Sequence, residues 1–462
     1  MSRRRPYGVA STATPGRVAA LDITRRVREN DARVSDVAAT VLDPLALPVE
    51  EKGFATLLSI GVVSTWGTLD ELIDSVLRTP KDVACDVRDA LRISVYELIF
   101  LHKSEHAAVD QGVELVRFVS PRATGLANFV LRRIVELGAT FPFGDPQTDF
   151  AAAARLHAFP EWLALLFKKD LGKRNALLLM DAANHPAPIW FMISRTRVDG
   201  KRVLDSLVAR GIKMEPVASL VPEQAAFTTF RLLDRSDIGD ELVRRLLQEG
   251  VLVVSDLSAQ SIVSFALPER MPKRFLEIGS GRGSKTIMLQ DGALGKYGEQ
   301  MPLETVEVSA AKNELLVDRI SRAGVRCECS HILDATDLSS LAAESFDAVF
   351  IDAPCTGVGT LRRHPEIRWR LKPRDIEVLA DLGFEMLVQA SRLVAHGGRL
   401  SYATCSVFEA ENAKVIRRFL KSKAGAGFEI VAVGHKGFDY FKSPIVQDGP
   451  DVHFCAVLRR CS

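Results

Sequence analysis

From about residue 274 to the C-terminus, short apolar runs alternate with helical patterns, and this alternation limits the possible folds more than any other feature of the chain. Strands that alternate with helices form a parallel sheet with helices on both faces. We therefore expect a Rossmann-like, doubly wound α/β domain, with the last two apolar runs suited to one edge of its sheet. The apolar runs lie at residues 274–278, 305–308, 348–351, 399–403, 430–433 and 454–458.

The preceding part of the chain has helical periodicity instead. Apolar residues recur at three- and four-residue intervals from about residue 18 to 137, which predicts an all-α bundle. A segment rich in proline and polar residues at 141–149 is typical of a linker. After a further helical stretch, the apolar run at 189–193 predicts the first strand of a small α/β unit that ends near residue 235.

These patterns predict three domains, at residues 1–140, 141–235 and 236–462, and a chain of 462 residues has the length expected for about three. The first is helical, the second contains a linker helix and the small α/β unit, and the third is the Rossmann-like domain. The formal net charge is +2, which excludes a uniformly basic protein. Any contact with nucleic acid must therefore come from local patches.

The seven cysteines form an odd set without a CxxC pair. Neither a disulfide framework nor a zinc site is therefore predicted, and we expect no bound metal. Free thiols suit a reducing compartment, and no segment approaches the roughly 18 uninterrupted apolar residues of a membrane span. We expect a monomeric cytoplasmic protein that does not bind membranes.

A glycine-rich turn, residues 279–286, lies between the first predicted strand of the third domain and a helix. Such a turn places backbone amides beside a ligand at a helix N-terminus. Its spacing departs from the dinucleotide pattern, and Ser284 stands where a P-loop needs a glycine before Lys285. A nucleoside triphosphate stays an alternative ligand, because the strand at 348–351 leads into Asp352, which would suit magnesium.

S-adenosylmethionine is the third candidate ligand for this turn. Its zwitterionic end suits backbone amides and a carboxylate, and its ribose suits an acid at the end of the next strand, where Glu307 stands. Asp334 has the corresponding place after the third strand. Either acid alone could equally cap a helix.

Two cysteines follow later strands, at the sheet edge where open α/β folds bind ligands. Cys355 comes three residues after Asp352, and Cys405 follows the strand at 399–403. The residues after Cys405 include a capping box that begins at Ser406. We therefore expect a helix to start there, with its N-terminus favouring the thiolate of Cys405.

A pair of cysteines beside a cofactor turn suits one kind of methylation. Carbon 5 of a pyrimidine is too weakly nucleophilic to take a methyl group until a nucleophile adds to carbon 6. A thiolate can make that addition, and a second acid/base group can help to remove the carbon 5 proton and expel the thiol. Methylation of nitrogen or oxygen needs no such thiolate, and neither does hydrolysis of a nucleoside triphosphate.

The motifs at these positions closely resemble those of the Sun-type (RsmB-like) bacterial 16S rRNA cytosine-5 methyltransferases. Segments at 91–101, 106–115 and 128–133 are similar to helices of the NusB-like domain that precedes the catalytic domain in these enzymes. The resemblance spans nearly the whole chain and implies that the small α/β unit binds RNA. The catalytic motifs are Asp352-Ala-Pro-Cys355-Thr-Gly-Val-Gly, Arg362-Arg-His-Pro-Glu-Ile-Arg-Trp-Arg370, Thr404-Cys-Ser406 and Glu411-Asn412.

The resemblance implies Cys405 as the nucleophile and Cys355 as the residue that helps to release the product, with Asp352 and Lys285 completing the catalytic group. It also implies S-adenosylmethionine as cofactor and RNA as substrate, either 16S rRNA or an assembly intermediate. The turn departs from the usual Ala-Pro-Gly-Gly-Lys motif, because it has Gly281-Arg282-Gly283-Ser284-Lys285. The implied cofactor-binding residues are Gly279, Ser280, Gly281, Arg282, Gly283, Ser284, Lys285, Glu307, Asp334 and Asp352.

Arginines are concentrated at 361–374, with Trp369 among them, and this is the local positive patch that an RNA substrate requires. Its position directly after the Cys355 loop favours RNA contact. Two alternatives to the methyltransferase stay open on the residues alone. One is a non-catalytic RNA-binding assembly factor, which the changed cofactor turn would permit, and the other is a P-loop-like NTPase.

Overall fold

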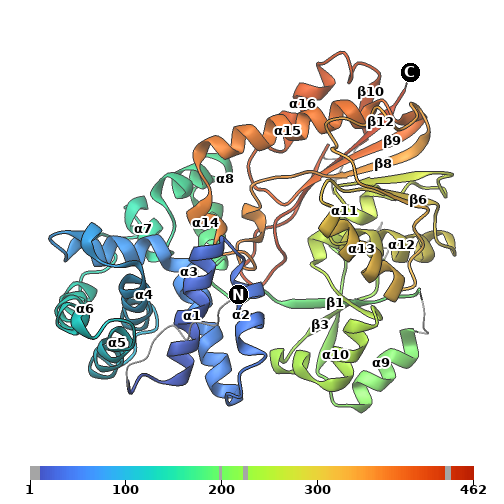
Figure 1. Ribbon diagram of the computed structural model, residues 1–462. Coiled ribbons are helices and arrows are strands. Elements are labelled where there is room, and N and C mark those ends of the chain that lie inside the picture. The colour runs from blue at the N-terminus through green and yellow to red at the C-terminus, as the bar shows by residue number, and fades with distance from the viewer. Residues whose placement is uncertain (1–10, 197–199, 222–226, 432–438, 462) are drawn as a thin grey trace. The chain divides into compact units, whose positions relative to one another are not determined.

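The computed structural model describes residues 11–196, 200–221, 227–431 and 439–461 (Figure 1). These residues form two compact units. The helical unit contains the chain up to His185 together with Leu361–Leu371, and the second unit contains Pro186–Thr360 and the chain from Lys372 onward. Among the described residues, no helix is long and apolar enough to cross a membrane.

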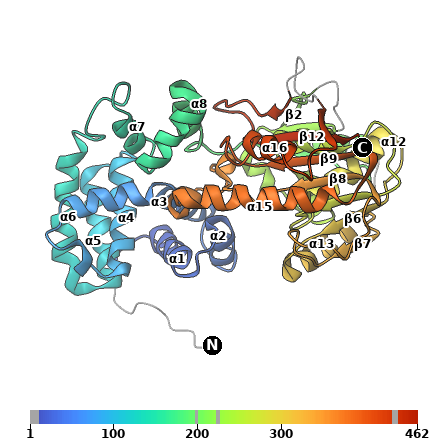
Figure 2. The same ribbon diagram turned by 90° about the horizontal axis from the view of Figure 1, so that it is seen from above.

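The helical unit is a bundle around one apolar core, which confirms the predicted all-α first part of the chain (Figure 2). Helix α1 begins with a proline at its first position and is followed by the C-cap residue Asp31, whose φ is 48°. Leu58, Leu91 and Val130 are fully buried in the core. The helices are α1 (Pro15–Asn30), α2 (Val34–Leu42), α3 (Val49–Ser75), α4 (Cys85–Ile99), α5 (Glu105–Val119), α6 (Thr124–Gly138), α7 (Phe150–Leu156) and α8 (Glu161–Ala182).

A second piece of chain, residues 361–371, also belongs to the helical unit, and it includes the short helix α14 (Ile367–Arg370). The indole nitrogen of Trp369 donates a hydrogen bond to the carbonyl of Ser64 in α3, at 2.9 Å. The indole ring covers Gly67, where an added Cβ would lie 2.2 Å from the ring. The ring therefore requires a glycine at this point of α3.

The small sheet of the second unit has the strand order β2-β3-β1-β4, and its neighbouring strands are antiparallel. In chain order the elements alternate as βαββαβ. The sheet includes β4, which lies beyond the boundary predicted at residue 235; the boundary itself stays a prediction. The elements are β1 (Ile189–Ile193), α9 (Gly200–Ala209), β2 (Met214–Val217), β3 (Thr229–Leu232), α10 (Glu241–Gln248) and β4 (Leu252–Val254).

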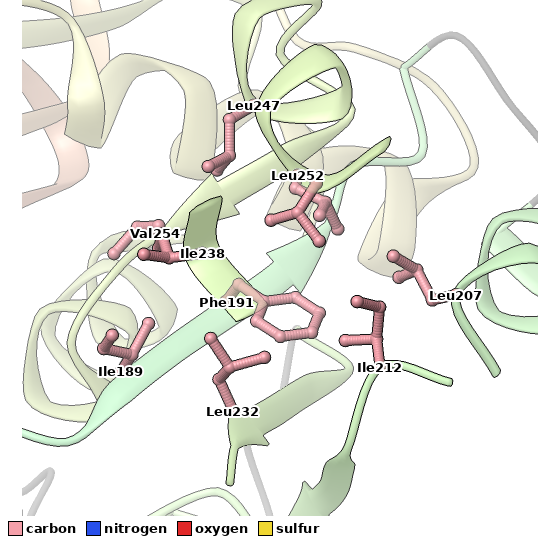
Figure 3. A pocket seen from close by; sticks show the side chains of 10 residues that line it. Ile189, Phe191, Leu207, Ile212, Leu232, Ile238, Leu247, Leu252 and Val254 are labelled. Carbon is pink, nitrogen blue, oxygen red and sulfur yellow. The ribbon is translucent and has the colours of Figure 1, made fainter. Parts of the chain in front are cut away.

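Apolar side chains cover both faces of this small sheet. Figure 3 shows the ring of Phe191 of β1 directed toward Ile212 and toward Leu207 of α9, and Leu247 of α10 also lines the hollow on this face. The hollow between them has a volume of about 10 Å³, which is the room of a single water, so it is a packing gap. On the other face, Met192 and Val253 are buried in the core that contains α11 (Leu257–Ala266).

The large sheet is doubly wound, which confirms the predicted Rossmann-like domain. Five parallel strands have the order β7-β6-β5-β8-β9, and the antiparallel strands β12 and β10 extend the β9 edge, with β11 paired to β12. The strands are β5 (Phe275–Ile278), β6 (Leu303–Val306), β7 (Cys329–His331), β8 (Phe346–Asp352), β9 (Val394–Thr404), β10 (Phe428–Val431), β11 (Phe441–Lys442) and β12 (Phe454–Arg460).

Successive side chains of β5 and β8 enter two different apolar cores, because side chains alternate along a strand. Phe275 and Phe350 pack with α12 (Ser284–Tyr297) and α13 (Ala310–Arg322). Leu276 and Val349 pack on the opposite face with α15 (Pro373–Ser391) and α16 (Ala413–Leu420). Figures 1 and 2 show these two helices on the same side of the large sheet. The strand order reverses between β5 and β8, and open α/β sheets bind ligands at the carboxyl ends of such strands.

Candidate active site

The turn that follows β5 needs glycine at three positions, because φ is 81° at Gly279, 57° at Gly281 and 79° at Gly283. A Cβ at Gly279 would also lie 2.5 Å from the carbonyl oxygen of Asp352, at the end of β8. Gly283 caps α12 without a side-chain hydrogen bond. The first amides of α12 are therefore available to a carboxylate ligand.

Glu307 faces this turn from the end of β6. Its carboxylate accepts hydrogen bonds from the backbone amides of Gly281, at 2.9 Å, and Ser309, at 3.0 Å, and the residue is buried. Asp334 is different, because it is exposed after β7 and accepts hydrogen bonds from the amide and hydroxyl of Thr336. No hydrogen bond of the described residues joins Asp334 to the turn, so its cofactor role stays a prediction.

Amides at a helix N-terminus together with a buried carboxylate suit the methionine and ribose parts of S-adenosylmethionine. The residues that would hold this cofactor are those of the turn, 279–285, together with Glu307. When bound, it would supply an electrophilic methyl group at the carboxyl edge of the sheet. The structure thus brings most of the predicted cofactor residues together.

Lys285 and Asp352 form an ion pair beside the turn, with 2.6 Å between Nζ and Oδ2. Burial disfavours the charge on Lys285, but the carboxylate of Asp352 and the nearby Cys405 outweigh it and raise the pKa of the ammonium. Lys285 therefore keeps a positive charge next to Asp352, at the end of β8, and Cys405, which follows β9.

Glu277 is a residue of this site whose role the sequence did not reveal. It lies in β5, is fully buried, and accepts a hydrogen bond from the hydroxyl of Thr286 at 2.6 Å, while its Oε1 has no partner among the described residues. Burial raises its pKa to about 7. The sequence signals were an acid within an apolar strand and its place where Asp is usual in the resembling methyltransferases.

Cys355 and Cys405 lie in the turns after β8 and β9, and their sulfur atoms are 3.3 Å apart. The backbone amide of Cys405 also donates to the sulfur of Cys355, at 3.3 Å. The hydrogen bond between the two sulfurs, together with burial, raises the pKa of Cys355 well above its ordinary value. Cys355 is therefore the member of the pair that keeps its proton.

Buried polar contacts hold the two cysteine turns against each other. The amide of Gly359 donates to the carbonyl of Cys405, and the amide of Val452 donates to the carbonyl of Gly359, both at 2.9 Å. Glu411 is nearly inaccessible and accepts from the amide and hydroxyl of Thr356, at 2.7 Å each, and from the hydroxyl of Ser406. Gly359 and Glu411 thus position the two thiols, and sequence reasoning assigned them no role.

The prediction that a helix begins at Ser406 is wrong. Helix α16 begins at Ala413, eight positions after Cys405, so its dipole does not act directly on that thiol. The physical reason is that Ser406 bonds the buried Glu411 instead of capping a helix, and that the side-chain amide of Asn412 donates to the carbonyl of Ser406 at 2.9 Å. The positive charge beside Cys405 comes from Lys285 instead.

The RNA-contact role predicted for the arginines near Trp369 is wrong for Arg368, because its side chain is buried, and it stays a prediction for Arg370. Arg368 is fully buried in the helical unit, where it donates to the carbonyls of His157, Ala158 and Ala183. Arg370 forms an ion pair with Asp31 at 2.6 Å. These guanidinium groups hold the segment in the helical unit because backbone carbonyls and a carboxylate there replace their hydration.

The fold and the cofactor turn define the class: this is an S-adenosylmethionine-dependent methyltransferase. Residues 265–453 match the family model described as 16S rRNA methyltransferase RsmB/F, and residues 14–136 match the NusB family. A candidate methyltransferase of Mycobacterium tuberculosis is 30% identical, with 99% of this chain and 98% of that protein covered. Ribosomal RNA small subunit methyltransferase B of Escherichia coli is 29% identical over 84% of this chain and 86% of that one.

Solved structures agree on the fold. The crystal structure of PH0851 has a TM-score of 0.76 and 22% identity, and covers 98% of this chain and 100% of that one. A methyltransferase homolog from Pyrococcus horikoshii has a TM-score of 0.54 and 19% identity, and covers 67% and 97%. The chain therefore belongs to the RsmB/F methyltransferase family, with an N-terminal NusB-like domain. This confirms the predicted family and cofactor and excludes the NTPase alternative.

Proposed function

We propose that the protein methylates carbon 5 of a cytosine in 16S rRNA, in the cytoplasm, through a covalent bond between Cys405 and carbon 6 of the base. The single observation that carries this proposal is the contact of the two sulfurs at the carboxyl edge of the sheet, beside Lys285 and the cofactor turn. The family description and the name of the Escherichia coli relative support ribosomal RNA of the small subunit as substrate.

The first step is addition of the Cys405 thiolate to carbon 6, and it moves the electron pair of the carbon 5–carbon 6 bond toward carbon 5. Lys285 supports this step, because its positive charge favours the thiolate before the attack. Carbon 5 then takes the methyl group that the bound cofactor supplies. The base must leave its stack to reach the cysteines, so an unpaired cytosine is the favoured target.

Release of the product needs a base for the carbon 5 proton, and we assign this role to Cys355. In the free enzyme the neighbouring Cys405 raises the pKa of Cys355. Once Cys405 is bonded to carbon 6 it carries no charge, so Cys355 can lose its proton to solvent. The Cys355 thiolate then takes the proton from carbon 5, the carbon 5–carbon 6 double bond re-forms, and Cys405 leaves as a thiolate. The starting state of both cysteines is restored.

Substituting each cysteine separately tests the different roles proposed for Cys405 and Cys355. Cys405→Ala should abolish methyl transfer to an unmodified 16S rRNA transcript, whereas Cys355→Ala should accumulate an enzyme–RNA adduct that survives denaturing electrophoresis. Cys85→Ala, at an exposed cysteine of the helical unit, is the matched control and should behave as wild type. Normal turnover of Cys405→Ala would sink the proposal. A wild-type protein that binds the transcript without methylating it would favour the assembly factor.

The target nucleotide can be found in cells. Bisulfite sequencing of rRNA from strains with and without the gene would identify each cytosine whose methylation depends on it. One lost site in 16S rRNA is the expected result. An unchanged 16S rRNA profile would contradict the proposed substrate.

A further inference from the structure

A groove with a volume of about 230 Å³ lies in the second unit, next to the cofactor turn. Its walls come from the end of α10 and from β4 on one side, and from α12 and α13 on the other. The apolar part includes Val254, which is 41% exposed, and Ile287. The polar part includes Arg319 and Arg322 of α13 and Gln248 of α10. We call this feature the arginine groove.

Two guanidinium groups, those of Arg319 and Arg322, line the arginine groove and form its basic cluster. Arg319 donates from Nη1 to the carbonyl of Arg282, at 2.9 Å, and to the hydroxyl of Ser284, at 3.1 Å, so it stands against the cofactor turn. Burial and the charges of Arg322 and Arg282 lower the pKa of Arg319. Among the described ion pairs, one brings a carboxylate to this cluster: Asp318 pairs with Arg322 at 2.5 Å. The cluster therefore has a net positive charge, which an anion would stabilise.

The chemistry of the groove favours a phosphate diester. Guanidinium groups bind phosphate oxygens through two parallel hydrogen bonds, and an apolar wall suits the sugar or base next to the phosphate. S-adenosylmethionine carries a sulfonium, an ammonium and one carboxylate, so its net charge is positive and it would not neutralise the cluster. Arg282 stands where a proline is usual in the resembling turns, so this chain adds a charge at the edge of its cofactor site.

Two features that the sequence suggested for RNA contact, the arginines near Trp369 and the small sheet, make other contacts among the described residues. Arg368 and Arg370 are bonded within the helical unit. Met192 and Val253 bury one face of the small sheet, and Figure 3 shows the apolar packing on the other. The arginine groove lies beside the turn that would hold the methyl donor, so an RNA strand bound there would lie near the reaction.

We propose that the arginine groove binds the sugar-phosphate backbone of the RNA substrate, with Arg319 and Arg322 contacting a phosphate. This inference rests on the proposed function, because it takes RNA as the substrate. It assigns Arg322 to substrate binding and not to the chemical step.

The test uses the full chain, an unmodified 16S rRNA transcript and the variant Arg322→Glu. We expect the KM for RNA to rise at least fivefold, and the slope of log Kd for RNA against log salt concentration to fall by about 1. The affinity for S-adenosylmethionine should stay within twofold, measured by calorimetry. Arg322→Lys keeps the charge and should recover most of the RNA affinity. Arg392→Glu makes the same change of charge at an exposed position after α15 and is the matched control.

An Arg322→Glu protein with wild-type RNA affinity and salt dependence would overturn the proposal. Weaker cofactor binding with unchanged RNA binding would also overturn it, because the arginines would then serve the turn alone. A loss of RNA affinity in Arg392→Glu equal to that in Arg322→Glu would show a general charge effect instead of a site. RNA binding needs no methyl transfer, so a wild-type protein that leaves the transcript unmethylated contradicts the proposed function and leaves the groove testable.

Discussion

The sulfur of Cys355 lies 3.3 Å from the sulfur of Cys405, although the two residues are 50 positions apart in the chain. The contact is fixed from both sides, because Gly359 bonds the carbonyl of Cys405 and Glu411 bonds the residues that follow each cysteine. The two turns therefore behave as one structural element. A chemical change at one thiol should therefore change the reactivity of the other.

Oxidation should link this pair. Diamide takes two electrons and two protons from two thiols, so the cysteines become a disulfide and diamide becomes the hydrazine. We expect treated enzyme to lose more than about nine-tenths of its methyltransferase activity and to recover it with dithiothreitol, because the nucleophile is consumed. A thiol count before and after treatment measures the reaction. In Cys355→Ser this internal disulfide cannot form, and wild-type enzyme that stays active under diamide would argue against the contact.

Gly359→Ala should impair catalysis without loss of the cofactor. A Cβ at this position would lie 2.0 Å from the carbonyl oxygen of Val452 and 2.8 Å from that of Cys405, and both are backbone atoms. The turn that carries Cys405 must therefore move, and we expect kcat to fall at least tenfold. Gly125→Ala is the control, because its Cβ would meet nothing within 4 Å. A variant with normal kcat would mean that the turns tolerate separation.

The sequence predicted the catalytic fold well because its signals are local. The run at 274–278 became β5, and the turn glycines occupy conformations that other residues avoid. The strand predicted at 305–308 is β6, but it begins two residues earlier than predicted. Glu304 belongs to this strand because its carboxylate is bonded to Arg274 and His331. A paired charge inside a strand hides the strand from a pattern of apolar residues.

The remaining features of the site depend on distant partners. Arg368 was predicted to contact RNA, but its acceptors lie 184 to 211 positions earlier in the chain. Ser406 looked like a helix cap, but its hydroxyl bonds a carboxylate that tertiary packing buries. Composition and spacing report that such residues are charged or polar. They do not report which buried group each one meets.

Glu277 should make stability depend on pH in a defined direction. Burial holds its pKa at about 7, above the ordinary 4.5, so the folded protein binds more protons than the unfolded chain between these values. Its contribution to stability is therefore full below about pH 4.5 and is lost as the pH rises through 7, by roughly 3 kcal/mol. Glu277→Gln cannot ionise, so its free energy of unfolding relative to wild type should increase by this amount from pH 5 to pH 8.

Urea unfolding at both pH values measures that difference. Glu385→Gln, at an exposed position of α15, is the control for the change of charge. A difference between Glu277→Gln and wild type that is the same at both pH values would show that Glu277 is ionised at pH 5 in the folded protein, against the effect of its burial.

Arg368 should stabilise the helical unit through its buried contacts. Its guanidinium lies 4.1 Å from the ring centre of Phe159 and donates to the carbonyl of Ala158 at 3.2 Å and to the side chain of Asn184 at 2.9 Å. Burial lowers its pKa to about 9. Arg368→Met keeps the length of the side chain but leaves these acceptors buried without donors, so we expect the unit to lose about 3 kcal/mol of stability.

Thermal and urea unfolding, followed through a tryptophan signal, would measure this loss. Arg374→Met is the matched control, because Arg374 lies only six positions further along the chain but is exposed and belongs to the second unit. The Arg374→Met protein should have the same unfolding midpoints as the wild type. If Arg368→Met were as stable as wild type, the arginine would be dispensable for folding, and an RNA-binding role for this segment would have to be reconsidered. A large loss confined to Arg368→Met would instead identify these arginines as the means by which residues 361–371 are held in the helical unit.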